Sequence, residues 1–337
     1  MTTAGGVGPS AGGAGATAGG AEIVEIGLNA AIVAVAGGSP LILVVSAEGS
    51  LQRDGLPFGP FDPARHRTFE TSLRDSVEKQ TALSLGYIEQ LYTFGDRGRH
   101  RLPGETAKHM VSVGYLALTR SEAEDGGRLA AQGAAFRDWY RYLPWEDWRT
   151  GRPKLIDEII VPALSRWEQS AAAGDRAAAR AARIRLAFGT GDLPWDEERV
   201  LERYELLYEA GLVAEAAEDG HVAARPDVAL GQTMRHDHRR IFATAVARLR
   251  GKIKYRPVIF ELMPPDFTLT ALQTTVEAIS GRHLHKQNFR RLVEANALVE
   301  PTGDMSIATG GRPAALFRFR RQVLAERPSA GLKLGGR

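Results

Sequence analysis

The sequence contains no cysteine among its 337 residues, and aromatic residues make up only 7% of it. Without cysteine the chain forms no disulfide, holds no thiolate-bound iron–sulfur cluster and uses no thiol in catalysis. It also lacks any apolar run that approaches the ~20 residues needed to cross a bilayer. We therefore expect a soluble protein of the reducing cytoplasm, with no membrane partner.

The composition suits a globular protein, because 44% of the residues are hydrophobic and 25% are charged. A chain of this length has enough material for two globular domains and connecting helices. Residues 1–20 are almost wholly Gly, Ala, Ser and Thr, so they predict a disordered tail. The last residues, 326–337, are predicted to form a second, flexible tail.

The segment after the first tail has the composition of a buried sheet. Its β-branched and apolar runs are separated by turn residues and by one amphipathic helix. This order of strands and helix predicts an α/β sandwich with a mixed sheet. The predicted elements are strands at 23–35 and 41–46 around a turn at 37–40, a helix at 68–85, and strands at 87–94 and 109–118.

The middle of the chain, residues 153–234, is rich in Ala, Arg, Glu and Leu and predicts several helices, including 171–187 and 196–210. Two interpretations stay open for this segment. It either links and spaces two domains or forms part of a dimer interface. The five tryptophans in and before it favour packing over a cofactor site.

The most readable stretch is 267–320. Thr268 can cap a helix over 269–279 that ends at Gly281, and a second helix is predicted at 285–295. Two predicted strands, 297–300 and 315–319, follow around a glycine-rich loop. Helix, turn, helix and hairpin form the pattern of a winged helix-turn-helix, an α+β domain.

Charge favours DNA as the partner of this region. Between Arg235 and Arg321 there are sixteen Lys or Arg against seven Asp or Glu, a balance of +9 in a chain whose total is only +3. Such a domain attracts phosphates, and exposed Lys, Gln, Asn and Arg side chains can read base edges. The alternative is an ordinary solvated face. The candidate DNA-binding residues are Thr268, His285, Lys286, Gln287, Asn288, Arg290, Arg291, Arg312 and Arg318.

Residues 59–83 resemble a degenerate Nudix box, the loop–helix motif that holds divalent metal over a nucleoside diphosphate. Arg74, Asp75 and Glu78 match motif positions, whereas His66 replaces one motif glutamate and Lys79 replaces another. Helical spacing puts the motif carboxylates on one face, where they share a hard cation. Since Lys79 places an ammonium group there, we expect no catalysis, no metal and no required cofactor.

The segment 92–101 resembles the strand and loop that follow the box in Nudix proteins related to ADP-ribose pyrophosphatases. Its glycines permit a tight backbone, and its arginines could pair bidentately with a diphosphate. The alternative is a basic surface loop. The candidate effector-binding residues are Arg74, Glu78, Arg97, Arg99 and Arg101.

Both halves together resemble the Nudix-related transcriptional regulators of NAD metabolism, including their longer alphaproteobacterial branch. The resemblance implies a dimeric repressor whose inactive Nudix-like domain senses NAD, ADP-ribose or ATP and whose winged helices bind operator DNA before NAD biosynthesis genes. Two other functions stay open: an active hydrolase of ADP-ribose-like nucleotides, and a DNA-associated scaffold without a ligand. The implied domains are a Nudix-like domain at 21–152, a helical linker or dimerisation segment at 153–234, and a winged helix-turn-helix at 235–325.

The pair His236 and His238 around Asp237 could be read as metal ligands. It stands, however, where a helix over about 237–252 must begin, and Asp is a favourable N-cap residue. No third ligand has a diagnostic spacing. The sequence therefore predicts that Asp237 caps this helix.

Overall fold

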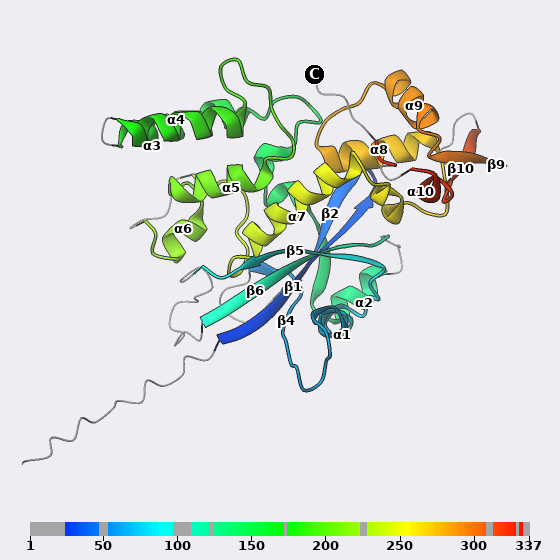
Figure 1. The fold of residues 1–337 in the computed structure, drawn as a ribbon, viewed down its shortest axis with the longest axis horizontal. Coiled ribbons are helices and arrows are strands. Elements are labelled where there is room, and N and C mark those ends of the chain that lie inside the picture. The colour runs from blue at the N-terminus through cyan, green and yellow to red at the C-terminus, as the bar shows by residue number, and fades with distance from the viewer. Residues whose placement is uncertain are drawn as a thin grey trace, which may run out of the picture.

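The computed structural model describes residues 24–46, 53–96, 109–120, 125–171, 174–222, 228–307, 313–327 and 330–332. The predicted tail at 1–20 lies outside these residues. The described chain forms an α/β domain around one twisted sheet, a group of helices on one side of it, and a smaller winged helix domain beside it (Figure 1). Among the described residues no helix is both long and apolar enough to cross a membrane.

The central sheet is mixed, as predicted. Seven described strands form it, with β1 paired in parallel with β6 and antiparallel with β2 and β4. The order along the sheet is β3-β2-β1-β6-β5, with β7 attached to β2. The strands are β1 (Val24–Ala36), β2 (Ser39–Ser46), β3 (Asp54–Gly55), β4 (Phe58–Pro60), β5 (Tyr87–Phe94), β6 (His109–Leu118) and β7 (Ala134–Asp138).

The β1–β2 hairpin turns at Gly37 and Gly38, whose φ angles are +56° and +78°. Both angles favour glycine, and two consecutive positive values match the tight turn that suits twisted strands. The first two predicted strands are therefore confirmed within two residues, and the predictions for β5 and β6 are confirmed to the residue.

The helix α1 (Phe69–Thr81) is shorter than the predicted helix at 68–85. Thr68 caps its start, and Ala82 ends it in the left-handed conformation with φ +55°, its N–H bonded to Glu78 O. Leu73 and Val77 bury one side of α1 against the sheet. The prediction missed the end because apolar residues continue through Leu85 after the backbone has left the helix. A short helix, α2 (Asp125–Ala131), also lies on this face.

The opposite face of the sheet is covered by α7 (His238–Ile253), which contacts β1, β5 and β6 (Figure 1). The predicted cap is wrong in detail, because Asp237 stands at the N-cap but its side chain makes no capping hydrogen bond. Its carboxylate instead accepts a hydrogen bond from Arg240 at 3.1 Å. The core of this face continues without interruption from the sheet through α7 into the winged helix.

In the described part of the middle segment, four helices pack outside α7, and α5 is in direct contact with it. Two predicted bounds are wrong at their starts. The first helix begins at Asp175 rather than at 171, and Asp196 begins a turn in which its side chain accepts from Glu198 N at 3.0 Å. The helices are α3 (Val161–Gln169), preceded by a π-helical turn at Ile156–Ile160, α4 (Asp175–Phe188), α5 (Val200–Glu209) and α6 (Ala214–Glu218).

The C-terminal domain has the predicted helix, turn, helix and hairpin, and a short extra strand that completes a three-stranded sheet. The first wing strand begins two residues later than predicted, because Ala297 has a φ of +47° that an extended strand cannot adopt. It also ends six residues later than predicted, at Ser306. The elements are β8 (Asp266–Phe267), α8 (Leu269–Ser280), α9 (Lys286–Ala295), β9 (Val299–Ser306), β10 (Ala314–Phe319) and α10 (Val323–Glu326).

The end of the chain does not behave as the predicted flexible tail throughout. Ala330 and Leu332 are buried, and Leu332 N donates to Ile253 O at 2.8 Å. This contact joins the C-terminal segment to the end of α7.

Candidate nucleic-acid interface and effector site

The helix α8 is built by local signals. Its N-cap Thr268 accepts a hydrogen bond from Ala271 N at 3.1 Å, as the sequence predicts, and Gly281 ends it with a φ of +74°. Leu272, Val276 and Ile279 are fully buried, so α8 is the inner helix of the pair. Thr268, one of the candidate DNA-binding residues, thus uses its hydroxyl to cap the helix.

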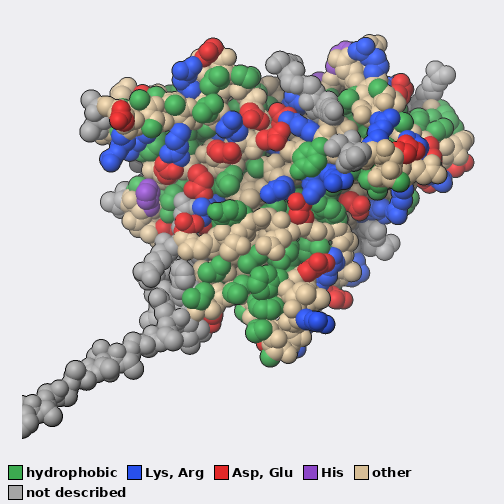
Figure 2. All heavy atoms as spheres, in the orientation of Figure 1, with side chains coloured by type: hydrophobic (Ala, Val, Ile, Leu, Met, Phe, Trp, Pro, Cys, Tyr) green, Lys and Arg blue, Asp and Glu red, His purple; other side chains and the backbone are tan. Residues whose placement is uncertain are grey.

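The helix α9 is the outer helix. Phe289 and Val293 are buried against α8, while the side chains on the other faces are open to solvent. Figure 2 shows Lys and Arg side chains gathered around this end of the molecule. The helix-turn-helix therefore presents the predicted donors outward: His285 at the N-cap, then Lys286, Gln287, Asn288, Arg290 and Arg291.

In the described part of the wing, positive charge lies beside carboxylates. Arg318 on β10 is exposed, but its Nε lies 3.4 Å from Asp266 on β8. Two exposed carboxylates, Glu300 and Asp304, lie on β9. Arg312 lies outside the described residues. Among the described residues, the exposed charge of α9 is thus the better match to a phosphate backbone.

The turn between α8 and α9 is fixed by side chains that sequence reasoning did not single out. Leu284 N donates to Glu277 Oε1 at 2.8 Å, and Gln273 Nε2 donates to Leu284 O at the same distance. Gln273 also donates to Glu277 at 2.9 Å. These bonds orient α9 on α8. The four-residue separation of Gln273 and Glu277, which places both on one face of α8, was the sequence signal that could have identified them.

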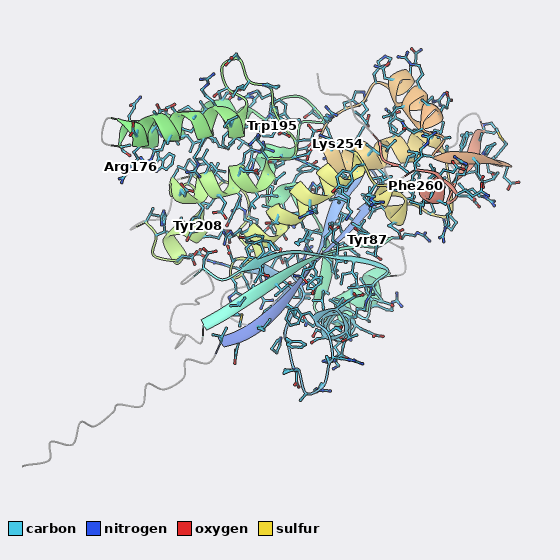
Figure 3. All side chains as sticks on the ribbon, in the orientation of Figure 1. Tyr87, Arg176, Trp195, Tyr208, Lys254 and Phe260 are labelled. Carbon is cyan, nitrogen blue, oxygen red and sulfur yellow. The ribbon has the colours of Figure 1, made fainter. Side chains whose placement is uncertain are left out.

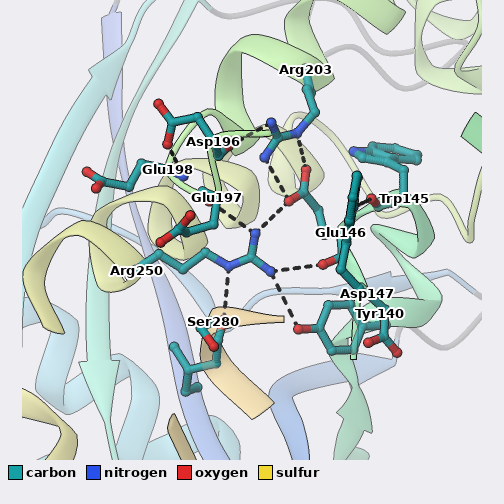
Figure 4. Close-up of polar contacts among 12 residues, drawn as sticks. Tyr140, Trp145, Glu146, Asp147, Asp196, Glu197, Glu198, Arg203, Arg250 and Ser280 are labelled. Atoms are coloured by element: carbon teal, nitrogen blue, oxygen red, sulfur yellow. Dashed lines mark hydrogen bonds and ion pairs between the residues drawn. The ribbon is translucent and has the colours of Figure 1, made fainter. Parts of the chain in front are cut away.

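A buried ion-pair cluster joins this turn to the rest of the protein (Figure 4). Arg203 donates to both carboxylate oxygens of Glu146, at 2.5 and 2.9 Å, and Arg250 donates to Glu146 Oε2 at 2.6 Å. The three side chains are at most 1% exposed. Buried charges persist only when paired and hydrogen-bonded, so this cluster is a fixed structural unit.

The cluster contacts the end of α8 directly. Arg250 Nε donates to Ile279 O at 2.9 Å, and the hydroxyl of Tyr140 donates to Ala278 O at 2.8 Å. Trp148 N donates to Gly281 O at 2.6 Å. A Cβ on Gly281 would lie 2.5 Å from Glu146 O, so only glycine fits. No pattern in the sequence predicted this junction.

On the other side of the sheet, α1 and the chain before it bring together three of the residues compared with the Nudix motif. Lys79 Nζ lies 2.6 Å from Asp75 Oδ2, and His66 Nε2 lies 3.3 Å from the same oxygen. The hydrogen bond from Lys79 lowers the pKa of the Asp75 carboxyl. No cluster of His, Asp and Glu suited to a metal ion occurs in the described part of the chain. A cationic side chain is thus already paired with the Asp75 carboxylate.

The two candidate effector residues on α1 differ in their surroundings. Arg74 donates to Glu70 Oε1 at 2.9 Å and to the carbonyls of Leu85 and Gly86, so its guanidinium ties the helix to the chain that follows it. Glu78 is exposed. The other three candidates, Arg97, Arg99 and Arg101, lie outside the described residues.

A cavity of about 330 Å³ opens beside the start of α1. The hydroxyl of Tyr115 donates to Gln90 Oε1 at 3.2 Å within it, and burial raises the pKa of Tyr115. None of its lining residues is cationic, so the cavity offers aromatic and amide contacts rather than a site for phosphate. It is lined by Thr68, Phe69, Glu70, Ile88, Gln90 and Tyr115.

Comparisons with known proteins agree with this arrangement. Residues 259–319 match the family of NrtR DNA-binding winged helix domains. The ADPR responsive transcriptional repressor NtrR of Acinetobacter baylyi is 44% identical over 94 residues, which are 28% of this chain and 37% of that protein. The match therefore spans little more than a third of that relative's length.

The fold matches solved structures over most of the chain. NrtR of Shewanella oneidensis in complex with a 27mer DNA is 19% identical with a TM-score of 0.52, over 89% of this chain and 95% of that one. A second crystal structure of Shewanella oneidensis NrtR gives a TM-score of 0.50 over 88% of this chain and 95% of that one. The chain thus has the NrtR fold, a Nudix-like α/β domain with a mixed sheet and a C-terminal winged helix.

Proposed function

We propose, from the NrtR-type winged helix at residues 259–319 and the exposed basic face of α9, that this protein is a transcriptional repressor that binds operator DNA. In this proposal Lys286, Gln287, Asn288 and Arg290 contact bases in the major groove. The positioning contacts to phosphate come from Arg291, Arg312 and Arg318, with His285 and the capped start of α8 at Thr268 nearby.

The proposed effector is an adenine nucleotide of the NAD, ADP-ribose or ATP group that binds the Nudix-like domain. ADP-ribose is the first of these to test, because the Acinetobacter relative is named for its response to it. A diphosphate suits bidentate arginine, so Arg97, Arg99 and Arg101 are the proposed contacts. Arg74 and Glu78 are proposed to border the site, with Arg74 acting mainly through the chain that it holds in place.

The Nudix-like domain is proposed to bind its effector without cleaving it and to need no metal or other cofactor. Lys79 and His66 flank Asp75, so a divalent cation would meet positive charge or an imidazole where the box normally supplies carboxylates. Restoring glutamate by Lys79→Glu is expected to give no hydrolysis, because His66 remains. Release of AMP by the unaltered protein with Mg²⁺ or Mn²⁺ would instead establish the hydrolase alternative.

We also propose that the protein acts in the cytoplasm as a homodimer that controls NAD biosynthesis genes. Two winged helices in a symmetric dimer would meet half-sites about one helical turn apart. The helices of 153–234 are proposed to contribute to the dimer interface, between a Nudix-like domain at 21–152 and a DNA-binding region at 235–325. A monomer by sedimentation on operator DNA would contradict the dimer.

The test is a fluorescence-anisotropy titration on DNA from upstream of NAD synthesis genes, at fixed salt, with and without ADP-ribose. We expect Arg290→Ala to weaken operator binding by about 1–3 kcal/mol if Arg290 contacts a base. Arg137→Ala is the matched control, because Arg137 is exposed on β7 of the central sheet, outside both the winged helix and the proposed dimer interface. Equal affinity for random DNA and no response to any nucleotide would contradict the proposal.

A further inference from the structure

The helix α7 connects the two regions to which effector and DNA are assigned. It lies across the sheet antiparallel to β5, with Arg240 near the end of β5 and Lys252 near its beginning. Ile241, Ala245 and Leu249 are fully buried on the sheet side. A helix with a fully buried face in a close-packed core moves as a rigid body together with the surface it covers.

The first turns of α7 are attached to the end of β5 through Arg240. Its guanidinium pairs with Asp96, with Glu205 on α5 and with Asp237. It also lies 5.1 Å from the ring centroid of Phe94. Asp96 directly precedes Arg97 in the sequence, so Arg240 holds the described chain next to the arginines proposed to bind the effector.

The last turn of α7 is also attached to the start of β5. Lys252 pairs with Glu89 and lies 5.7 Å from the ring centroid of Tyr87, a residue labelled beside the sheet in Figure 3. Burial alone would raise the pKa of Glu89, but the hydrogen bonds from Lys252 and Tyr87 hold it below its usual value. A displacement of β5 therefore carries α7 with it.

The last turns of α7 are attached to the helix-turn-helix through Arg250. This side chain donates to Ile279 O at the end of α8 and to Glu146 in the buried cluster (Figure 4). Ten residues of helix separate Arg240 from Arg250, a length of about 15 Å. The same rigid helix thus holds the end of β5 at one end and the turn before α9 at the other.

We propose that α7 is the coupling element of this protein, with Arg240 and Arg250 as positioning residues that pass a displacement of the end of β5 to the helix-turn-helix. This inference rests on the proposed function. Ligand binding that moves the end of β5 shifts α7, and Arg250 moves the end of α8 with it. The spacing of the two α9 helices in a dimer then changes, which is the differential contact that a switch requires.

The test compares the full-length protein with Arg240→Gln and Asp96→Asn in the anisotropy assay, with ADP-ribose as the probe. The measured quantity is the ratio of operator dissociation constants with and without ADP-ribose, expected at about 5- to 150-fold for the unaltered protein. Arg248→Gln is the control, because Arg248 lies on the same helix but makes a weaker contact. Its side chain is 45% exposed, and its guanidinium lies 3.8 Å from Glu89. ADP-ribose binding itself is followed by calorimetry.

We expect both variants to bind operator and ADP-ribose as the unaltered protein does, while the ratio falls to about one. Arg248→Gln keeps the full ratio. A full ratio in Arg240→Gln and Asp96→Asn would overturn the coupling role, and so would loss of operator binding without nucleotide, which would make Arg240 a folding residue. Absence of any ratio in the unaltered protein would instead contradict the proposed function.

Discussion

Two clusters of charged side chains lie on opposite faces of the central sheet, and they differ in how much of each side chain is exposed to solvent. On α1, the Lys79 and Asp75 side chains are 57% and 36% exposed. In the buried cluster, Arg203, Glu146 and Arg250 are at most 1% exposed. Water screens the first pair and supplies partners when it opens, whereas the second has only protein atoms around it.

The comparison indicates which of the two clusters the fold depends on. On α1, Lys79 and Asp75 form a partly exposed surface pair, so a substitution leaves the remaining partner in contact with water. The buried cluster instead holds together segments that are 57 and 104 residues apart. We expect the cost of substitutions to follow this difference.

The largest loss is expected for Glu146→Ala, which leaves two buried guanidinium groups without the carboxylate they share. Breaking a buried ion pair costs about 3–5 kcal/mol, measured as the free energy of unfolding in urea. Glu146→Gln keeps the shape and an acceptor oxygen, so it should lose less. A loss for Glu146→Ala below about 1 kcal/mol, the average for any substitution, would break the comparison.

A smaller but still large loss is expected for Gly281→Ala, about 3 kcal/mol. The new Cβ would meet Glu146 O and Arg250 Nη2 at 2.5 and 2.7 Å, in addition to the strain of a positive φ. Gly37→Ala is the matched control, since Gly37 has a φ of +56° and nothing within 4 Å of its Cβ, and should cost about 1–2 kcal/mol. If thermal unfolding shows the same loss of stability for both variants, the residues around Gly281 can shift to accept a Cβ at little cost.

The helix caps are expected to behave alike in both regions, because a cap is a local interaction. Thr268→Ala on α8 and Thr68→Ala on α1 each remove one side-chain acceptor for a backbone N–H, worth about 1 kcal/mol. Circular dichroism during urea unfolding measures both. A loss at Thr268 as large as that at Glu146 would make this cap part of the tertiary junction.

The smallest effect is expected for Lys79→Ala, because its partner Asp75 is 36% exposed and stays in contact with water. The lowered pKa of Asp75 means that the pair stabilises the fold only above the ordinary carboxyl pKa and loses that contribution as the pH falls. The urea midpoint at neutral pH and physiological salt should not change measurably. A clear shift there, equal to that of Glu146→Gln, would remove the contrast between the two faces.

The sequence was most informative where structure depends on neighbours along the chain. The strands Tyr87–Phe94 and His109–Leu118 follow from runs of apolar and β-branched residues, and the cap and end of α8 follow from a threonine and a glycine. The outward face of α9 follows from helical spacing, as Phe289 and Val293 turn inward. The meeting of Lys79 and Asp75 follows from their four-residue separation. The predicted ends of helices were wrong where apolar or helix-favouring residues extend beyond a residue in the left-handed conformation, such as Ala82, or into a turn, such as that at Asp196.

By itself, the sequence determined the types and order of the main elements and the winged helix pattern, because these are local. Only the tertiary structure decided that α7 lies on the sheet, that the winged helix shares its core, and that Arg250 is buried. An arginine in a basic helix looks like a surface residue until its partner is known. That partner, Glu146, lies 104 residues away, and no local pattern specifies a contact across such a distance.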